Sequence, residues 1–320
     1  MIDVVALGEL LIDFATVSTD GDGYPTMAAH PGGAPANFLA ALTKFGAKTA
    51  MLGKVGTDTF GKLLLDTLRK AGIETRGMVE TDDVFTTLAF VTFDASGNRR
   101  FAFSRKPGAD TCISFEELDL GLIDEAKVFH FGTLSLTDEP ARSATYKAVA
   151  YAKSKGKLIT YDPNLRKPLW NSMEEAKKQI LWGLTQADVV KISDEEVEFL
   201  FGLGVEDGAA YILNNFPVKL VFVTCGADGC YFKNAVVSGK VPGMQGIQVK
   251  DTTGAGDIFG GSAIWKLLQT GKEPESLSEE ALREITTFAC VSASLSTTKY
   301  GGISSVPEYA EILKQADLLH

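Results

Sequence analysis

The sequence has few of the residues that mark several common classes of protein. Its 320 residues include only three histidines and four cysteines, namely His30, His130, His320, Cys112, Cys225, Cys230 and Cys290. The cysteines lack the spacing of metal ligands, so we expect buried thiols in a cytoplasmic protein. No Gly-x-Ser-x-Gly motif accompanies the histidines, which argues against a serine hydrolase. No apolar run reaches about 18 residues, so no membrane-spanning helix is expected.

Two common nucleotide-binding motifs are also missing. The G-x-x-x-x-G-K-[ST] motif of P-loop enzymes does not occur, and no G-x-G-x-x-G follows the first predicted strand, residues 2–8. Basic residues are in deficit, with 31 against 41 acidic residues and a formal net charge of −10. We therefore expect no general affinity for nucleic acid or anionic membranes, although a local basic site for a phosphorylated ligand is compatible with this charge. The N-terminus has no positive leader, so a signal peptide is not expected.

The pattern of apolar segments predicts a large α/β fold. Hydrophobic residues make up 45% of the chain, enough for a sizeable core. Apolar strands alternate with helices along most of the sequence, which indicates a three-layer α/β/α sandwich with a mostly parallel sheet. No repeat or low-complexity segment interrupts it, so we expect one domain over residues 1–320. The strands are predicted over residues 2–8, 49–55, 127–131, 158–161, 189–192 and 220–224.

The alternation breaks between residues 86 and 104. Two β-rich segments, Thr87–Phe93 and Arg100–Ser104, are joined by the turn-forming residues 94–99, which predicts a hairpin. Together with the polar segment 16–27 it would form a small sheet outside the main one. We expect a β lid formed by about residues 16–31 and 86–106, and the alternative is an ordinary sheet edge.

The most informative stretch is Asp251–Asp257, which precedes an apolar helix rich in small residues. The unpaired N–H groups of a helix start favour an anion, and Gly254 and Gly256 let the backbone approach a phosphate closely. The charge of Asp257 repels a phosphate, unless its role is to take a proton from a hydroxyl that attacks the phosphate. We expect the helix dipole to lower the pKa of this carboxyl. The alternative is that Asp257 only caps the helix.

Other polar or glycine-rich turns follow predicted strands or precede helices. Open α/β sheets bind ligands at the carboxyl ends of their strands, so we expect these turns to surround one site. Each also has a plain structural alternative, such as a solvated turn for Asp13, a capping amide for Asn37 or a solvated charge for Arg105. The turns are Asp13, Gly32-Gly33, Asp162–Arg166, Ser193–Glu196 and Gly226–Gly229.

Taken in order, these motifs resemble the ribokinase-like sugar kinases of the PfkB family nearly from end to end. The most specific matches are the block from Gly32 to Gly61 and the stretch Asp251–Asp257. Residues 100–110, 161–170 and 191–196 look most like fructokinases. The resemblance implies an enzyme that phosphorylates a sugar with ATP and Mg²⁺. It also implies a homodimer, because lid sheets of this fold often pair between subunits.

The resemblance also assigns roles to individual residues. Asp257 matches the general base, and Gly254, Ala255 and Gly256 match an anion hole for the transferring phosphoryl group, with Arg166 beside it. The positions that match sugar-binding residues are Asp13, Gly32, Gly33, Asn37, Arg105 and Arg166. The positions that match the nucleotide site are Lys191, Ser193, Thr224, Gly226, Gly229, Gly254, Gly256 and Cys290.

Two cation sites are implied in the same way. Glu196 matches the glutamate of the family's N-x-x-E motif, which organises magnesium through water, but Ser193 stands where that motif has asparagine. A second set of positions matches a monovalent-cation site that takes K⁺. These positions are Asp251, Thr253, Gly301 and Ser305.

For the substrate, the resemblance favours D-fructose, phosphorylated to fructose 6-phosphate. The nearest rival is a 2-keto-3-deoxygluconate kinase, which tends to have a tyrosine two residues before the lid arginine; here Phe103 occupies that position. A kinase for nucleosides or aminoimidazole riboside is a third possibility. From other classes, a catalytically silent sugar-binding protein is opposed by the retained Asp257, and a Rossmann dehydrogenase by the missing glycine motif.

Overall fold

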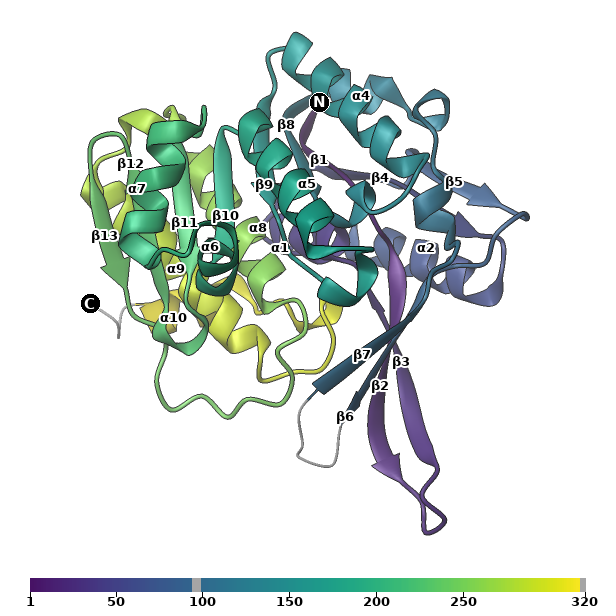
Figure 1. Ribbon diagram of the computed structural model, residues 1–320. Coiled ribbons are helices and arrows are strands. Elements are labelled where there is room, and N and C mark those ends of the chain that lie inside the picture. Colours follow the sequence, from purple (N-terminus) through teal and green to yellow (C-terminus); the bar gives the residue numbers. More distant parts are fainter. Residues whose placement is uncertain (94–98, 317–320) are drawn as a thin grey trace.

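A nine-stranded sheet forms the centre of the molecule. The computed structural model describes residues 1–93 and 99–316. His320 and nearly all of the turn predicted at 94–99 therefore lie outside the described residues. The strand order is β13-β12-β11-β10-β9-β8-β1-β4-β5 (Figure 1). All neighbouring pairs from β11 to β5 are parallel, whereas β12 and β13 add antiparallel strands at one edge. The bounds are β1 Ile2–Leu7, β4 Thr49–Gly56, β5 Met78–Thr81, β8 Ala126–Gly132, β9 Leu158–Asp162, β10 Val189–Ser193, β11 Leu220–Thr224, β12 Cys230–Asn234 and β13 Ser238–Val241.

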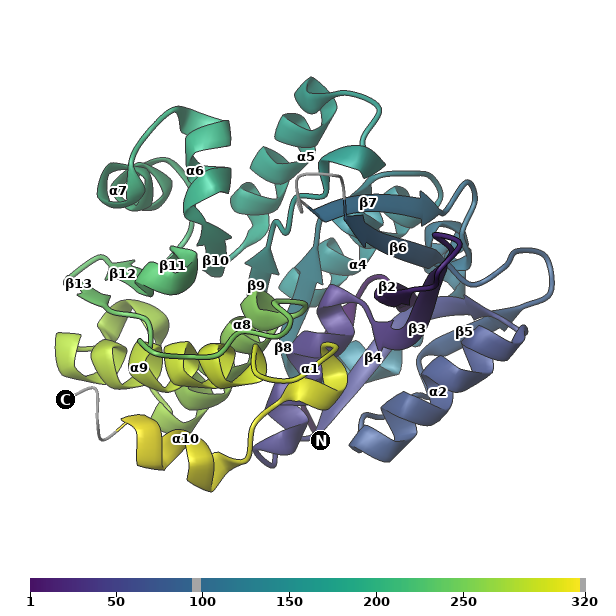
Figure 2. The same cartoon turned by 90° about the horizontal axis from the view of Figure 1, so that it is seen from below.

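Helices cover both faces of this sheet, so the predicted three-layer sandwich is confirmed (Figure 2). Side chains of β1 alternate between the two cores: Val4 and Ala6 pack into one, Val5 and Leu7 into the other. One layer holds α1 Ala34–Lys44, α2 Thr59–Ala71, α8 Ala255–Thr270, α9 Glu279–Ser296 and α10 Tyr309–Ala316. The other holds α3 Leu120–Glu125, α4 Ala141–Ser154, α5 Met173–Gln186, α6 Asp194–Phe201 and α7 Val205–Asn215.

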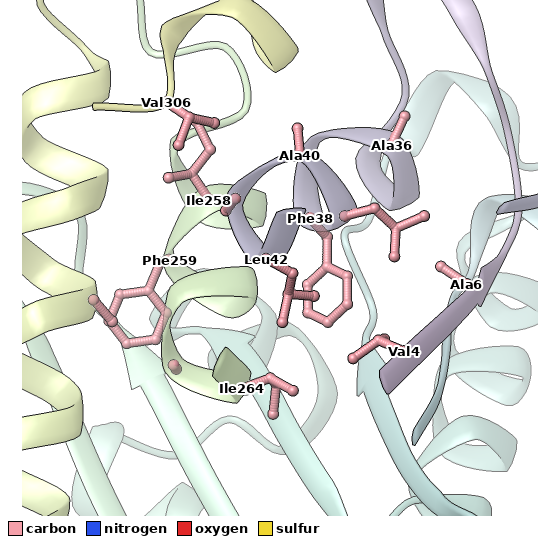
Figure 3. Close-up of a cluster of buried hydrophobic side chains, with 14 of the residues drawn as sticks. Val4, Ala6, Ala36, Phe38, Ala40, Leu42, Ile258, Phe259, Ile264 and Val306 are labelled. Carbon is pink, nitrogen blue, oxygen red and sulfur yellow. The ribbon is translucent and has the colours of Figure 1, made fainter. Parts of the chain in front are cut away.

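The close packing of α1 against α8 determines where the candidate site forms. In Figure 3, Phe38 and Leu42 of α1 lie beside Ile258 and Ile264 of α8. A Cβ atom at Gly261 would lie 2.3 Å from the Phe38 carbonyl oxygen, so only glycine allows this approach. The small residues of α8 therefore bring its first turn next to the first turn of α1.

A separate four-stranded sheet has the order β3-β2-β6-β7. Its hairpin of β6 Leu88–Phe93 and β7 Arg99–Ser104 confirms the pairing expected from the sequence. The other two strands are β2 Leu11–Thr19 and β3 Pro25–Gly32, and β2 begins earlier than the predicted residue 16. Asp13 consequently lies within β2, and the expectation that it ends a strand of the main sheet was wrong. The buried pair Leu11 and Ile12 explains this, because it starts a new strand directly after the turn at Gly8.

Candidate active site

The first turn of α8 is built around a tight turn at Gly254. This residue has φ 75°, in the left-handed region, and a Cβ atom there would lie 2.9 Å from the Gly302 Cα atom. No side chain caps α8, so the interpretation of Asp257 as a cap finds no support. Asp257 instead lies in the first helical turn with only 7% of its surface exposed.

Two asparagines hold the carboxylate of Asp257. The Asn37 amide donates to Oδ2 at 2.9 Å, and the Asn164 amide donates to Oδ1 at 3.0 Å. Burial raises the pKa of Asp257, and these two hydrogen bonds together with the charges of Lys191 and Arg166 oppose the rise. The expectation of a lowered pKa was therefore wrong, because desolvation is the largest of these effects. Asn164 was assigned no role of its own from the sequence, although it lies within the motif Asp162–Arg166.

The end of β3 and the start of α1 supply a second part of the site. A Cβ atom at Gly32 would lie 2.3 Å from Asp13 Oδ2, and one at Gly33 would lie 2.4 Å from the Glu9 carbonyl oxygen. The Glu9 carboxylate accepts a hydrogen bond from the Ala34 N–H at 2.8 Å, which fixes the start of α1. Burial raises the pKa of Glu9 to about 7. Glu9 was not singled out from the sequence, where it follows Gly8 as an ordinary turn residue.

A cavity, here called the polar pocket, opens in front of these residues. It brings together five of the residues predicted for sugar binding and proton transfer: Asp13, Gly33, Asn37, Arg166 and Asp257. Burial raises the pKa of Asp13 to about 7, with the charge of Arg166 opposing it. Within the described part of the chain, no ion pair engages Arg166, so its charge is available to a ligand. Other residues lining the pocket include Glu9, Leu11, Val91, Phe103, Asn164, Glu195, Thr253 and Gly254.

Arg105 is placed differently from the expected sugar contact. It is 4% exposed and does not line the polar pocket. Its guanidinium donates to Asp110 at 2.8 Å, to the Thr137 hydroxyl at 2.8 Å and to the Leu134 carbonyl at 2.8 Å. These bonds anchor the end of β7 to the main body of the protein. A sugar contact for Arg105 stays a prediction, and the acidic residue five positions later was the signal for its ion pair.

Glu196 is buried in the first turn of α6, next to the turn after β9. Its two carboxylate oxygens accept hydrogen bonds from the Leu165 N–H at 2.7 Å and the Ser193 N–H at 2.9 Å. The Ser193 hydroxyl accepts from the Glu196 N–H, which completes a capping box at the start of α6. Each carboxylate oxygen keeps one lone pair for water. This arrangement fits the predicted contact with magnesium through water, since Mg²⁺ usually retains several waters.

Lys191 lies beneath the first turn of α8. Its ammonium forms a buried ion pair with Asp162 at 3.1 Å, and a Cβ atom at Gly256 would lie 3.0 Å from it. Burial raises the pKa of Asp162 to about 7, opposed by the charge of Lys191. The ion pair holds the Lys191 ammonium directly below the turn that we expect to bind a phosphoryl group.

A second cavity, here called the apolar pocket, lies on the other side of the α8 turn. It contains Thr224, Gly226, Gly229 and Cys290, all predicted to meet a nucleotide, together with Ala255 and Gly256. Lys191, Ser193 and Gly254, predicted for the same site, do not line it, and Gly254 lines the polar pocket instead. The remaining walls are mostly apolar and include Met244, Ile247, Val249, Phe259 and Ala293.

Three of the four residues predicted for a monovalent cation, Asp251, Thr253 and Gly301, are joined by hydrogen bonds to the Asp251 carboxylate. Its Oδ1 accepts from the Thr253 N–H at 3.0 Å and hydroxyl at 2.7 Å, and its Oδ2 accepts from the Gly301 N–H at 3.0 Å. Ser305 joins indirectly, because its hydroxyl donates to the Gly302 carbonyl at 2.8 Å. These carboxylate, hydroxyl and carbonyl oxygens are of the kind that hard cations prefer.

Comparison with known proteins identifies relatives of this chain. The model of the pfkB family carbohydrate kinases matches residues 1–309. Fructokinase-2 of Solanum lycopersicum is 44% identical over 315 residues, covering 97% of this chain and 94% of that protein. Among solved structures, a fructokinase with bound ATP from Xylella fastidiosa has a TM-score of 0.90 and 29% identity, covering 99% of each chain. A putative ribokinase II from E. coli in complex with ATP and Mg²⁺ has a TM-score of 0.86 and 27% identity, covering 100% of each chain. The chain belongs to the pfkB family of carbohydrate kinases.

Proposed function

We propose that this protein is an ATP-dependent fructokinase that converts D-fructose to fructose 6-phosphate. The observation that carries the proposal is the position of Asp257, a buried carboxylate that lines the polar pocket in the first turn of α8, where the polar and apolar pockets meet. The fructokinases from Solanum lycopersicum and Xylella fastidiosa support the choice of fructose.

The proposed reaction is a single phosphoryl transfer. The oxygen of the sugar's primary hydroxyl bonds to the γ-phosphorus of ATP, and the bond from that phosphorus to the β,γ-bridging oxygen breaks. The hydroxyl proton passes to Asp257, and the products are the sugar phosphate and ADP. Because burial raises the pKa of Asp257, this carboxylate is a stronger base than an exposed aspartate.

Charge on the transferring group has several partners in the proposed site. The N–H groups of Gly254, Ala255 and Gly256 lie at the positive end of the α8 dipole, and Arg166 adds a full charge from the polar pocket. Magnesium, when bound with ATP, neutralises charge on the phosphates. We assign Glu196 to the waters around the magnesium ion. We assign Asp251, Thr253, Gly301 and Ser305 to a K⁺ site.

The second sheet fits a lid, and we propose this role for residues 16–31 and 86–106 within a single kinase unit. Leu11, Val91 and Phe103 of this sheet line the polar pocket, so its position affects access of water to the sugar.

The exposed Val17 and Tyr24 favour pairing with a second copy of the sheet. Light scattering that gave only monomers would remove the proposed homodimer. The four free thiols suit the reducing cytoplasm, where we place the protein.

A substrate panel tests the proposed activity. ADP release would be measured with D-fructose, 2-keto-3-deoxygluconate, ribose and aminoimidazole riboside as acceptors. We expect the highest kcat/KM with fructose, because Phe103 lines the pocket without a hydroxyl to hold a sugar acid. A higher kcat/KM with the keto-deoxy acid would assign Arg166 to a carboxylate and overturn the choice of fructose.

A further inference from the structure

Asn164 has an unusual backbone conformation in the turn after β9. Its φ of 48° lies in the left-handed region, where residues other than glycine are uncommon. Asparagine tolerates this region better than most residues, but the conformation persists only where the surroundings impose it. Both neighbours of Asn164 are tied down. The Pro163 carbonyl accepts hydrogen bonds from the N–H and the hydroxyl of Thr133, and the Leu165 N–H donates to Glu196 at 2.7 Å.

This conformation directs the Asn164 amide at Asp257. The amide donates to Oδ1 at 3.0 Å, while Asn37, from a different element, donates to Oδ2 at 2.9 Å. With one donor on each oxygen, the carboxylate is held against rotation about its last bond. Each oxygen retains a lone pair that can receive a proton. The two amides therefore hold the group while leaving it able to act as a base.

We propose that Asn164 is a positioning residue for Asp257: its amide fixes the orientation of the carboxylate that takes the sugar proton and favours its charged form. The inference rests on the proposed kinase function and extends it to a residue outside the predicted set. It also gives Glu196 a second effect. By accepting the Leu165 N–H, Glu196 holds the turn in which Asn164 lies.

Other charges facing Asp257 define the background against which Asn164 acts. Lys191 from β10 and Arg166 from the turn after β9 favour the carboxylate. Asp13 from β2 and Asp162 from β9 oppose it. A hydrogen bond to the charged form lowers a carboxyl pKa, so loss of the Asn164 donor should raise the pKa of Asp257 further.

Three substitutions separate the amide from the backbone conformation. Asn164→Gly removes the amide and fits the left-handed backbone, whereas Asn164→Ala removes the amide and adds strain there. Asn164→Asp keeps the shape but replaces the donor with a second carboxylate. We expect the glycine variant to lose at least about tenfold in kcat, as for a lost hydrogen bond to a charged group, with both KM values within about twofold. The acid limb of its kcat–pH profile should move to higher pH. The Asn164→Asp variant should show a larger shift of this limb than the Asn164→Gly variant.

The pKa of Asp257, followed by ¹³C NMR in the ligand-free protein, gives a readout that does not depend on the substrate. The resonance is assigned by its loss in Asp257→Asn. We expect a higher pKa in Asn164→Gly than in the wild type even if fructose proves to be the wrong sugar. Unchanged pKa values in both the Gly and Asp variants would overturn the inference. A raised KM for fructose with unchanged kcat would also overturn it, since that pattern indicates a sugar contact.

Discussion

The two pockets that meet at the first turn of α8 differ in chemistry. The polar pocket contains Asp13, Arg166 and Asp257, whereas the described residues lining the apolar pocket include no carboxylate and no basic side chain. A sugar presents hydroxyl groups that need directional hydrogen bonds, and a nucleobase presents a flat surface that apolar walls can bury. Thr252 lines both pockets, so the separation between the two sites is a single turn of chain. Under the proposed assignment of the two ligands, specificity for each ligand is encoded on its own side of this turn.

Removing the proposed general base, Asp257, should have the largest effect on turnover. In Asp257→Asn, we expect kcat to fall at least about 100-fold, in line with loss of a general base, while affinities for fructose and ATP stay near the wild-type values. Steady-state kinetics together with equilibrium binding would measure both. Near-normal turnover in this variant would show that Asp257 does not take the proton.

A pair of matched substitutions should separate the two pockets. The Gly32 backbone suits alanine, but a Cβ atom there would lie 2.3 Å from Asp13 Oδ2, so Gly32→Ala displaces that carboxylate. We expect KM for fructose to rise about tenfold or more, as for a lost hydrogen bond to a charged group, with KM for ATP unchanged. Ala293→Leu narrows the apolar pocket and should raise KM for ATP about tenfold, with KM for fructose unchanged.

Equal effects on both substrates would contradict the separation of the two pockets. If either variant raised both KM values equally, the pockets would act as one site. Thermal unfolding of both variants is the control, because a general loss of packing would lower the melting temperature and affect both substrates.

The smallest expected effect concerns the pH dependence of sugar binding. The pKa of Asp13 is raised to about 7, so this group gains a proton as the pH falls through 7. If the carboxylate accepts sugar hydroxyls, fructose affinity should weaken about eightfold between pH 7.5 and 6, as the charged fraction of a group of that pKa falls. Calorimetry without ATP would measure this, and Asp13→Asn should remove the dependence. An unchanged pH dependence in that variant would assign it to another group.

The sequence predicted the parts of the site that depend on glycine and on strand order. Gly254 and Gly256 marked the close turn, and the alternation of strands and helices predicted the sandwich. The sign of the pKa change at Asp257 was wrong because burial depends on α1 and the turn after β9, which only the fold brings together. Asn164 was missed for a related reason. Its significance comes from a left-handed backbone, and asparagine is also common in ordinary turns.

Arg105 and Arg166 show the same limit. Both are arginines after predicted strands, and the resemblance gave both a role at the sugar. The structure buries Arg105 in an ion pair with Asp110 but leaves Arg166 facing the polar pocket. Pairing partners of long side chains depend on tertiary contacts, which sequence patterns do not specify.

The most direct test is to follow the reaction of the wild-type protein with D-fructose and ATP by ³¹P NMR. The proposed mechanism requires a sugar hydroxyl, rather than water, between Asp257 and the γ-phosphate. The account predicts that fructose 6-phosphate and ADP form in equal amounts, with no inorganic phosphate above background. ADP accompanied by inorganic phosphate, or by no sugar phosphate, would contradict it.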